Sequence, residues 1–230
     1  MIAALFDIDG TLIQTGGAGQ LAFAETFADV FGVAQISAEV KFAGRSDRAI
    51  ASELMEVHGL EPSPENWRRF HDAYLQRLPA ALERRTGQVL PGVVELLDVL
   101  GAESDCVVGL LTGNVVAGAR TKLGYYGLAD RFPFGGFGDE LLDRNDIAAA
   151  ALAAAHGECS RAGRVLSGAI VIGDTEHDVR CARAIGAVAV AVPTGGATRE
   201  ALAATQPDML LDDLSDAAPL LQAVRRGLAA

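Results

Sequence analysis

The sequence predicts an α/β fold: a Rossmann-like parallel sheet core with an inserted α-helical subdomain. Short apolar runs of β type alternate with helical patterns from residue 89 onward, which is typical of a parallel sheet with helices on both faces. Residues 9–105 separate the first apolar run from the second, whereas a single helical crossover needs only about a dozen residues. With 230 residues, half of them hydrophobic, the chain is long enough to bury such a core.

The expected strands are short apolar runs that end near an acidic residue or a glycine. They cover residues 2–8, 106–111, 169–172, 187–192 and, less clearly, 209–211. Helical patterns lie between and after them, over residues 93–100, 115–123, 147–155, 178–185, 199–204 and 217–228. We therefore expect residues 1–14 and 89–230 to form the α/β core.

The inserted segment, residues 15–88, contains helical patterns but no clear strand. Three helices are expected, over residues 19–31, 46–57 and 64–85. Ser63 before Pro64 indicates a helix start, because the hydroxyl accepts from a free backbone N–H and proline loses no hydrogen bond there. Ser46 before Asp47 gives a similar signal. Eight basic residues nearly balance ten acidic ones in the insert, so an anion would approach more easily from this side.

Composition excludes several classes of protein. The net charge is −11 and basic residues cluster only in pairs, so nucleic acid and anionic membranes are poor partners. The sequence has no apolar stretch long enough to span a bilayer and its start does not resemble a signal peptide, so we expect a cytoplasmic protein. Cys106, Cys159 and Cys181 form neither a disulfide framework nor a metal motif. Buried, reduced thiols are the expectation, although a nucleophile remains the alternative.

Two carboxylates, Asp7 and Asp9, follow the first apolar run directly. Open α/β sheets bind ligands at the carboxyl ends of their strands, and Gly10 allows the chain to turn there. Two such close acids repel each other, and a hard divalent cation such as Mg²⁺ would lower that repulsion while one carboxylate oxygen stays free to attack a substrate. A solvated turn after a strand is the simpler alternative.

A second acidic group follows a later strand. Asp174 and Asp178 lie four residues apart after the run 169–172, and they share a face if a helix begins there. Because the ends of parallel strands meet at one edge of the sheet, these acids could join the first pair around a shared metal. Asp178 could also be an ordinary acid in a first helical turn, and we assign Glu176 and His177 to that class.

The third group lies at the end of the run 106–111. Thr112, Gly113 and Asn114 offer a hydroxyl, free backbone N–H groups and an amide, which suit an anion, although they are equally typical of a turn. A bound anion also needs a fixed cation. Only two lysines exist, Lys41 and Lys122; Arg144, just before an expected helix, is the better placed candidate.

Together these residues resemble the haloacid dehalogenase-like phosphohydrolases, whose four motifs occur here in order. They are Asp7-x-Asp9-Gly-Thr, Thr112-Gly-Asn, a basic residue, and Gly-Asp174-x-x-x-Asp178. The insert falls where this family places a helical type-1 cap, and residues 174–186 look like the phosphoglycolate-phosphatase-like branch. The third motif is usually lysine, so Arg144 is a departure and Lys122 remains the alternative.

The resemblance implies a Mg²⁺-dependent phosphatase of a small phosphorylated metabolite. Asp7 would attack phosphorus to form an aspartyl-phosphate, and Asp9 would serve as acid and then as base. Mg²⁺ would bind Asp7, the Asp9 carbonyl, Asp174 and, directly or indirectly, Asp178. Thr112 and Arg144 would hold phosphoryl oxygens, with Gly113 and Asn114 beside them. Arg45, in a cap loop, could clamp a substrate carboxylate, as in phosphoglycolate.

Other readings stay open at this point. A phosphomutase of the β-phosphoglucomutase kind shares the same aspartyl-phosphate. Phosphonatase chemistry would need a cap lysine, for which only Lys41 is available, and Asp9 argues against a true dehalogenase. A non-hydrolytic protein that accepts or binds phosphate, such as a receiver domain, is the alternative from a different class.

Overall fold

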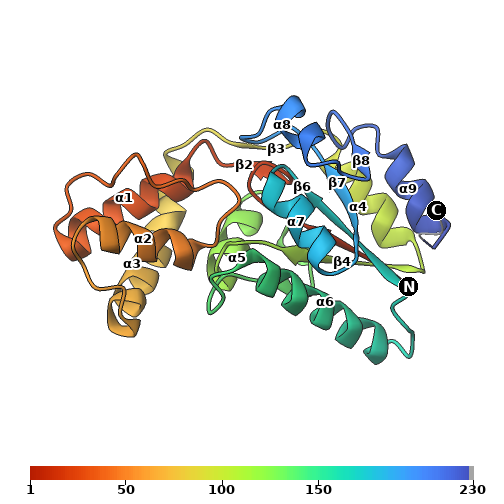
Figure 1. Cartoon of the computed structure of the whole chain (residues 1–230), viewed down its shortest axis with the longest axis horizontal. Helices are drawn as coiled ribbons and strands as arrows, with labels where there is room; N and C mark the ends of the chain where they lie inside the picture. The colour runs from red at the N-terminus through yellow and green to blue at the C-terminus, as the bar shows by residue number, and fades with distance from the viewer. Residues whose placement is uncertain (228–230) are drawn as a thin grey trace.

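The structure, a computed structural model, describes residues 1–227. Its centre is a six-stranded sheet in the order β5-β4-β1-β6-β7-β8, in which every neighbouring pair is parallel (Figure 1). The strands are β1 (Ile2–Phe6), β4 (Cys106–Leu111), β5 (Gly135–Gly136), β6 (Gly168–Gly173), β7 (Val188–Ala191) and β8 (Met209–Leu210). Because β1 lies between β4 and β6, the carboxyl ends of three central strands meet at one edge.

Helices cover both faces of the sheet. The residues of β1 are all buried and alternate between two cores: Ile2, Ala4 and Phe6 face one, Ala3 and Leu5 the other. Such continuous apolar strands are expected where a sheet is covered on both sides. The first core includes α4 (Val93–Ala102), α5 (Val116–Tyr125) and α9 (Ala218–Arg225); the second includes α6 (Arg144–Arg161), α7 (Glu176–Ala184) and α8 (Arg199–Ala204). A short 3-10 turn, η1 (Ala129–Arg131), follows α5.

The inserted helices form a separate body beside the sheet (Figure 1). They are α1 (Ala18–Phe31), α2 (Asp47–Val57) and α3 (Pro64–Glu83). Their own core includes the aromatic side chains of Phe23, Phe27, Phe70 and Tyr74. The chain leaves and re-enters the sheet region through an antiparallel pair, β2 (Ile13–Gln14) and β3 (Gln88–Val89).

The α/β fold class predicted from the sequence is confirmed, and so are the helix starts at Ser46 and Ser63, whose hydroxyls accept from backbone N–H groups. The strands β2, β3 and β5 were not predicted, because two residues are too few for a periodic pattern. Helix α6 is longer than expected, and Asp143 caps it. Helix α9 ends at Arg225; residue 228 of the expected helix lies outside the described part.

Two predictions from composition are also tested. All three cysteines are free and buried, and burial raises the pKa of Cys106 and Cys181 to about 11, so these two thiols are protonated at neutral pH. Within residues 1–227, no helix combines the length and apolar character needed to cross a membrane.

Candidate active site

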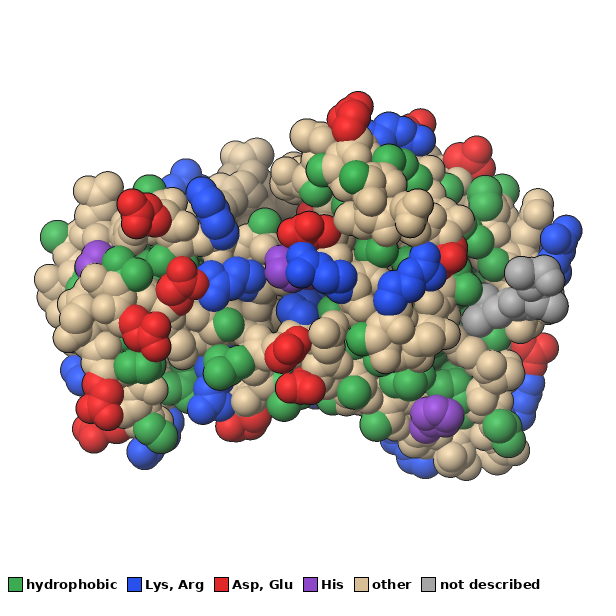
Figure 2. Space-filling model, viewed as in Figure 1, with side chains coloured by type: hydrophobic (Ala, Val, Ile, Leu, Met, Phe, Trp, Pro, Cys, Tyr) green, Lys and Arg blue, Asp and Glu red, His purple; other side chains and the backbone are tan. Residues whose placement is uncertain are grey.

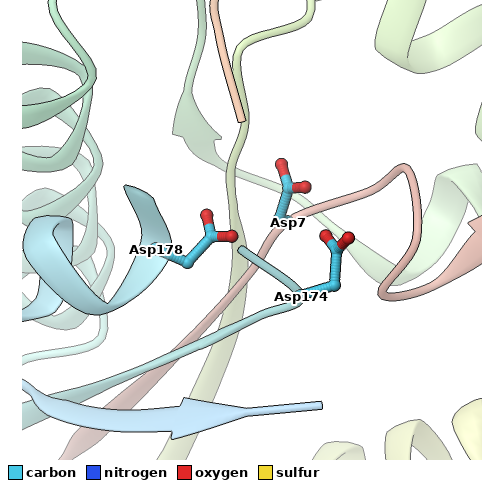
Figure 3. Close-up of side chains that lie close together, drawn as sticks. All are labelled: Asp7, Asp174 and Asp178. Carbon is cyan, nitrogen blue, oxygen red and sulfur yellow. The ribbon is translucent and has the colours of Figure 1, made fainter. Parts of the chain in front are cut away.

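Three carboxylates converge at the carboxyl edge of the sheet (Figure 3). Asp7 follows β1, Asp174 follows β6, and Asp178 lies in the first turn of α7. One oxygen of each lies within 4.8 Å of the others, and all three side chains are buried. The sheet topology therefore brings together acids that are far apart in the sequence, as we expected for Asp7 and Asp174.

The acidic cluster is electrostatically strained without a cation. Burial raises the pKa of Asp7 to about 7 against the pull of Arg144, and the carboxylates of Asp178 and Asp9 raise it further. Burial raises the pKa of Asp174 to about 8, and the carboxylates of Asp178 and Asp7 contribute to the rise. Buried carboxylates that crowd in this way are stabilised in the charged form by a hard cation such as Mg²⁺.

The individual contacts decide which oxygens remain open to such a cation. Asp178 Oδ1 accepts from Arg144, and Asp178 Oδ2 accepts from the backbone and hydroxyl of Thr175 at 3.0 and 2.7 Å. In the described part of the chain, the side-chain bonds that Asp174 accepts are longer, from Thr11 Oγ1 at 3.4 Å and from Gly196 N at 3.2 Å. The cluster therefore fits a divalent metal best through Asp7 and Asp174, while Asp178 is already engaged by Arg144 and by the start of α7.

Arg144 is the cation next to the first aspartate. It occupies the first position of α6, where Asp143 caps the helix, and its side chain is only 7% exposed. Its Nη1 lies 3.5 Å from Asp7 Oδ1 and its Nη2 pairs with Asp178. Its Nε has no hydrogen-bond partner within residues 1–227. Arg144 thus presents a buried, partly unpaired guanidinium beside Asp7, a suitable geometry for an anionic oxygen.

Asp9 contacts a different cation. Lys122 Nζ donates to Asp9 Oδ2 and to Asn114 Oδ1, each at 2.7 Å. Asn114 Nδ2 donates to the same Asp9 oxygen at 2.9 Å and to Thr112 Oγ1 at 2.8 Å. Burial opposes the charge of Lys122, but Asp9 and Asp47 outweigh it, so the pKa of Lys122 is raised. The two cations left open by the sequence therefore occupy different places, Arg144 at Asp7 and Lys122 at Asp9.

A cavity of about 380 Å³ lies between the insert and these residues. Its insert side includes the apolar side chains of Phe23, Phe42 and Ile50. Tyr74 also lines it, with a buried hydroxyl that has no hydrogen-bond partner in the described part of the chain. Thr112 is fully buried and does not line this cavity, whereas its neighbours Gly113 and Asn114 do.

The loop before α2 docks onto the core. Asp47 N donates to Gly113 O at 2.7 Å, and Asp47 Oδ2 accepts from Val115 N at 3.0 Å. Gly44 has a φ of +69°, and a Cβ there would overlap His177 and Thr175. In this arrangement the insert closes over the acidic cluster.

Arg45 lines the cavity but pairs with Glu53 of the insert and with the carbonyl of Lys41, not with the acidic cluster. A neighbouring hollow shares Arg45 and Arg144 with the cavity and adds His177 and Arg180. Figure 2 shows basic and histidine side chains in a row across the middle of the molecule, with acidic side chains above and below the row. Two of these arginines form ion pairs away from the acidic cluster, Arg45 with Glu53 and Arg180 with Glu176.

Sequence reasoning gave no role to several residues at this site. Thr11 is part of the first motif and contacts Asp174. Gly195 and Gly196 follow β7, and a Cβ at Gly195 would overlap the Asp174 carboxylate. Two consecutive glycines shortly after an apolar strand were the sequence signal that could have indicated this close approach to Asp174. Tyr74 belongs to a helical pattern that predicts which face of the helix is buried. The pattern does not predict which buried side chains line a cavity, so this position of Tyr74 could not be predicted from the sequence.

Comparison with known proteins now identifies the family. The model of the haloacid dehalogenase-like hydrolases matches residues 4–183. The chain is a haloacid dehalogenase-like hydrolase. The hydrolase is 31% identical to a phosphoglycolate phosphatase from Synechococcus elongatus, over 97% of each chain.

Solved structures agree with the fold of the hydrolase. CbbY from Rhodobacter sphaeroides in complex with phosphate superposes with a TM-score of 0.72 at 21% identity, covering 94% of this chain and 95% of CbbY. A mutant of CbbY in complex with xylulose-(1,5)-bisphosphate gives a TM-score of 0.71 at 22% identity, covering 93% and 95%. These two structures agree with the fold, and the 31% identity to the phosphoglycolate phosphatase makes the hydrolase a phosphoglycolate-phosphatase-like member of this family.

Proposed function

We propose that the hydrolase is a Mg²⁺-dependent phosphatase that releases orthophosphate from a small phosphomonoester such as phosphoglycolate. The observation that carries the proposal is the convergence of Asp7, Asp174 and Asp178 with Arg144 at one edge of the sheet. The relationship to a phosphoglycolate phosphatase supports the substrate class. The cavity of about 380 Å³ suits a small leaving group.

In the first step, a carboxylate oxygen of Asp7 attacks phosphorus and the bond to the ester oxygen breaks. Asp9 gives its proton to the departing alkoxide, so the product leaves as a neutral alcohol. Arg144 holds the non-bridging oxygens together with Gly113 and Asn114, which line the cavity. The Thr112 hydroxyl accepts from Asn114 Nδ2 and so fixes this turn from behind. The guanidinium stabilises charge that spreads over the phosphoryl oxygens in the transition state.

In the second step, water attacks the phosphorus of the Asp7 aspartyl-phosphate and the bond to the Asp7 oxygen breaks. Asp9, now a carboxylate, takes the proton of that water and is ready for the next cycle. The Asp7 carboxylate is regenerated as orthophosphate leaves.

We assign Mg²⁺ to the Asp7 carboxylate, the Asp9 backbone carbonyl and Asp174, with Asp178 as a supporting residue. When bound, this cation would neutralise the clustered acids and the charge of the phosphate. The role of Asp178 as support follows from its bonds to Arg144 and Thr175.

We also propose that residues 15–88 act as a cap on a core of residues 1–14 and 89–230. The docked loop from Phe42 to Asp47 excludes water from the cavity. Arg45 would reach a substrate carboxylate if its half-buried pair with Glu53 opens.

The test is a panel of phosphorylated compounds, assayed for orthophosphate release with Mg²⁺ or with EDTA. It includes phosphoglycolate, sugar phosphates, nucleotides and pyrophosphate. We expect release from a small phosphomonoester with Mg²⁺ and none with EDTA. Conversion of a sugar phosphate to its isomer without orthophosphate release would identify a mutase, and a stable phosphoryl-aspartate without turnover would identify a phosphate-accepting protein; either result would overturn the proposal.

A further inference from the structure

We infer that Lys122 is a positioning residue that holds the carboxylate of Asp9 in the orientation needed for proton transfer. This inference rests on the proposed function, in which Asp9 is the acid and then the base. Lys122 lies in the last turn of α5, and only 5% of its side chain is exposed. Its ammonium group donates to Asp9 and Asn114, and within residues 1–227 it makes no hydrogen bond to Asp7, Asp174 or Asp178.

The contacts fix one oxygen of Asp9 and leave the other open. Asp9 Oδ2 accepts from Lys122 Nζ and from Asn114 Nδ2. No N–H or O–H group within residues 1–227 donates a hydrogen bond to Asp9 Oδ1. Because Oδ2 already accepts two bonds, Oδ1 is the oxygen that can carry the proton to the leaving group. A fixed carboxylate keeps that proton aligned, which a side chain turning freely in solvent would not.

The lysine is itself held in place. Asn114 is bonded to Thr112 at the end of β4, and it accepts from Lys122. On the other side, a Cβ at Gly19 in α1 would lie 3.4 Å from Lys122 Nζ. Lys122 is therefore packed between core and insert, and its own position depends on both.

This role differs from that of a phosphate-binding lysine. Arg144 already lies beside Asp7, where phosphorus is attacked. Lys122 uses two of its three N–H donors on Asp9 and Asn114. Removing Lys122 should therefore affect the proton delivered to the leaving group more than the binding of the phosphoryl oxygens.

The first test compares two substrates for the variant Lys122→Met. An alkyl phosphate such as phosphoglycolate releases a poor leaving group that needs a proton, whereas p-nitrophenyl phosphate releases a stable anion that does not. The parameter is kcat/KM, which covers the steps up to transfer of the phosphoryl group. We expect a roughly 10- to 100-fold loss for the alkyl phosphate, part of the about 10²–10⁴ that general acid catalysis supplies. The loss for p-nitrophenyl phosphate should be at least about tenfold smaller. Equal losses for both substrates would overturn the inference.

The second test asks whether Lys122 acts through Asp9. In the Asp9→Asn background, Lys122→Met should add less than about a twofold further loss with the alkyl phosphate, because the group that it positions no longer transfers a proton. If Lys122 instead bound the phosphoryl group directly, Lys122→Met would lower kcat/KM by the same factor in the Asp9→Asn background as in the wild-type enzyme. The double variant also removes both charges of the pair, so it should fold even if Lys122→Met alone does not.

Two controls complete the design. Lys41→Met removes the other lysine, which is exposed, and should leave both substrates unaffected. Lys122→Gln keeps a hydrogen-bond donor and should recover part of the loss with the alkyl phosphate. If the wild-type enzyme releases no orthophosphate from either substrate with Mg²⁺, the proposed function fails; if it does and the variants lose both substrates equally, only the role of Lys122 fails.

Discussion

Asp7 and Asp9 are two residues apart, yet each contacts its own cation. Arg144 reaches Asp7 from the start of α6, and Lys122 reaches Asp9 from the end of α5. The difference matches the two proposed roles, since a nucleophile and a proton carrier need different surroundings. At the scale of single residues, the two aspartates should therefore respond differently to substitution.

Asp7→Asn should lower phosphatase activity by at least roughly 10³-fold, because the amide cannot form the aspartyl-phosphate. The melting temperature should stay the same or rise, since burial and the neighbouring acids already oppose the charge of Asp7. Asp216→Asn, at an exposed position, is the matched control for activity. The measurement is orthophosphate release together with thermal unfolding. Substantial activity in a clean preparation of the Asp7 variant would refute the assignment of the nucleophile.

Arg144→Met should destabilise the chain. It leaves Asp7 and Asp178 buried without their cation, and breaking a buried pair in this way typically costs about 3–5 kcal/mol. We expect denaturant unfolding at neutral pH with EDTA to show a loss of this order, and Mg²⁺ to restore part of it. An unchanged free energy of unfolding would mean that Arg144 does not balance these acids.

At the scale of elements, the start of α5 depends on the insert and on a loop of the core. Val115 provides no side-chain cap; instead Asp47 accepts from Val115 N and Asp139 accepts from Val116 N at 2.8 Å. Because α5 also carries Lys122, docking of the insert loop is linked to the helix that contacts Asp9.

Gly44→Ala should disturb this docking. The new methyl group would overlap His177 and Thr175, so the loop must move away from the start of α7. We expect kcat/KM for a small phosphomonoester to fall about tenfold, a typical consequence of displaced positioning groups. Gly59→Ala is the matched control, since Gly59 has a similar φ of +72° but open space around its Cβ position. Equal effects of the two substitutions would show that backbone strain alone, and not the contact, is responsible.

Some helices, strands and contacts could be predicted from the sequence and others could not. The long apolar runs predicted the central strands, and the repeated acids after them predicted that Asp7 and Asp174 would meet, because parallel strands end at one edge. The pairing of β2 with β3 could not be predicted, since each has two residues and the pairing depends on where the insert folds back. The separate positions of Arg144 and Lys122 also needed the packing of α5 and α6, because both lie far from Asp7 and Asp9 in the sequence.

At the scale of the whole molecule, the acidic cluster links stability to pH. Asp7 and Asp174 have pKa values of about 7 and about 8 in the folded chain, against an ordinary value of 3.8. At these two groups the folded chain therefore binds more protons than the unfolded chain between about pH 4 and pH 8. Stability without metal should fall as the pH rises through this range, because the carboxylates lose protons that the folded state favours.

Thermal unfolding at about pH 5.5 and pH 8, with EDTA or Mg²⁺, tests this link. With EDTA, these groups should lower the melting temperature at the higher pH. Mg²⁺ should raise it more at pH 8 than at pH 5.5, because the ligands must be deprotonated to bind metal. At a hundredfold excess over its Kd, a ligand adds about 2.7 kcal/mol, or roughly 5–10 °C for a chain of this size. A Mg²⁺ effect that is the same at both pH values would contradict the assignment of the cluster as the metal site.

The short pairing of β2 with β3 determines where the inserted segment could be exchanged for another. Ile13 pairs with Val89 and Gln14 with Gln88, so the whole segment between them begins and ends at almost the same point in space. Chains tolerate exchange of a domain whose ends are adjacent. The segment between β2 and β3 can thus be exchanged as a unit. Replacing it with the corresponding segment of a relative should transfer the relative's preference for a leaving group and leave the sheet unchanged.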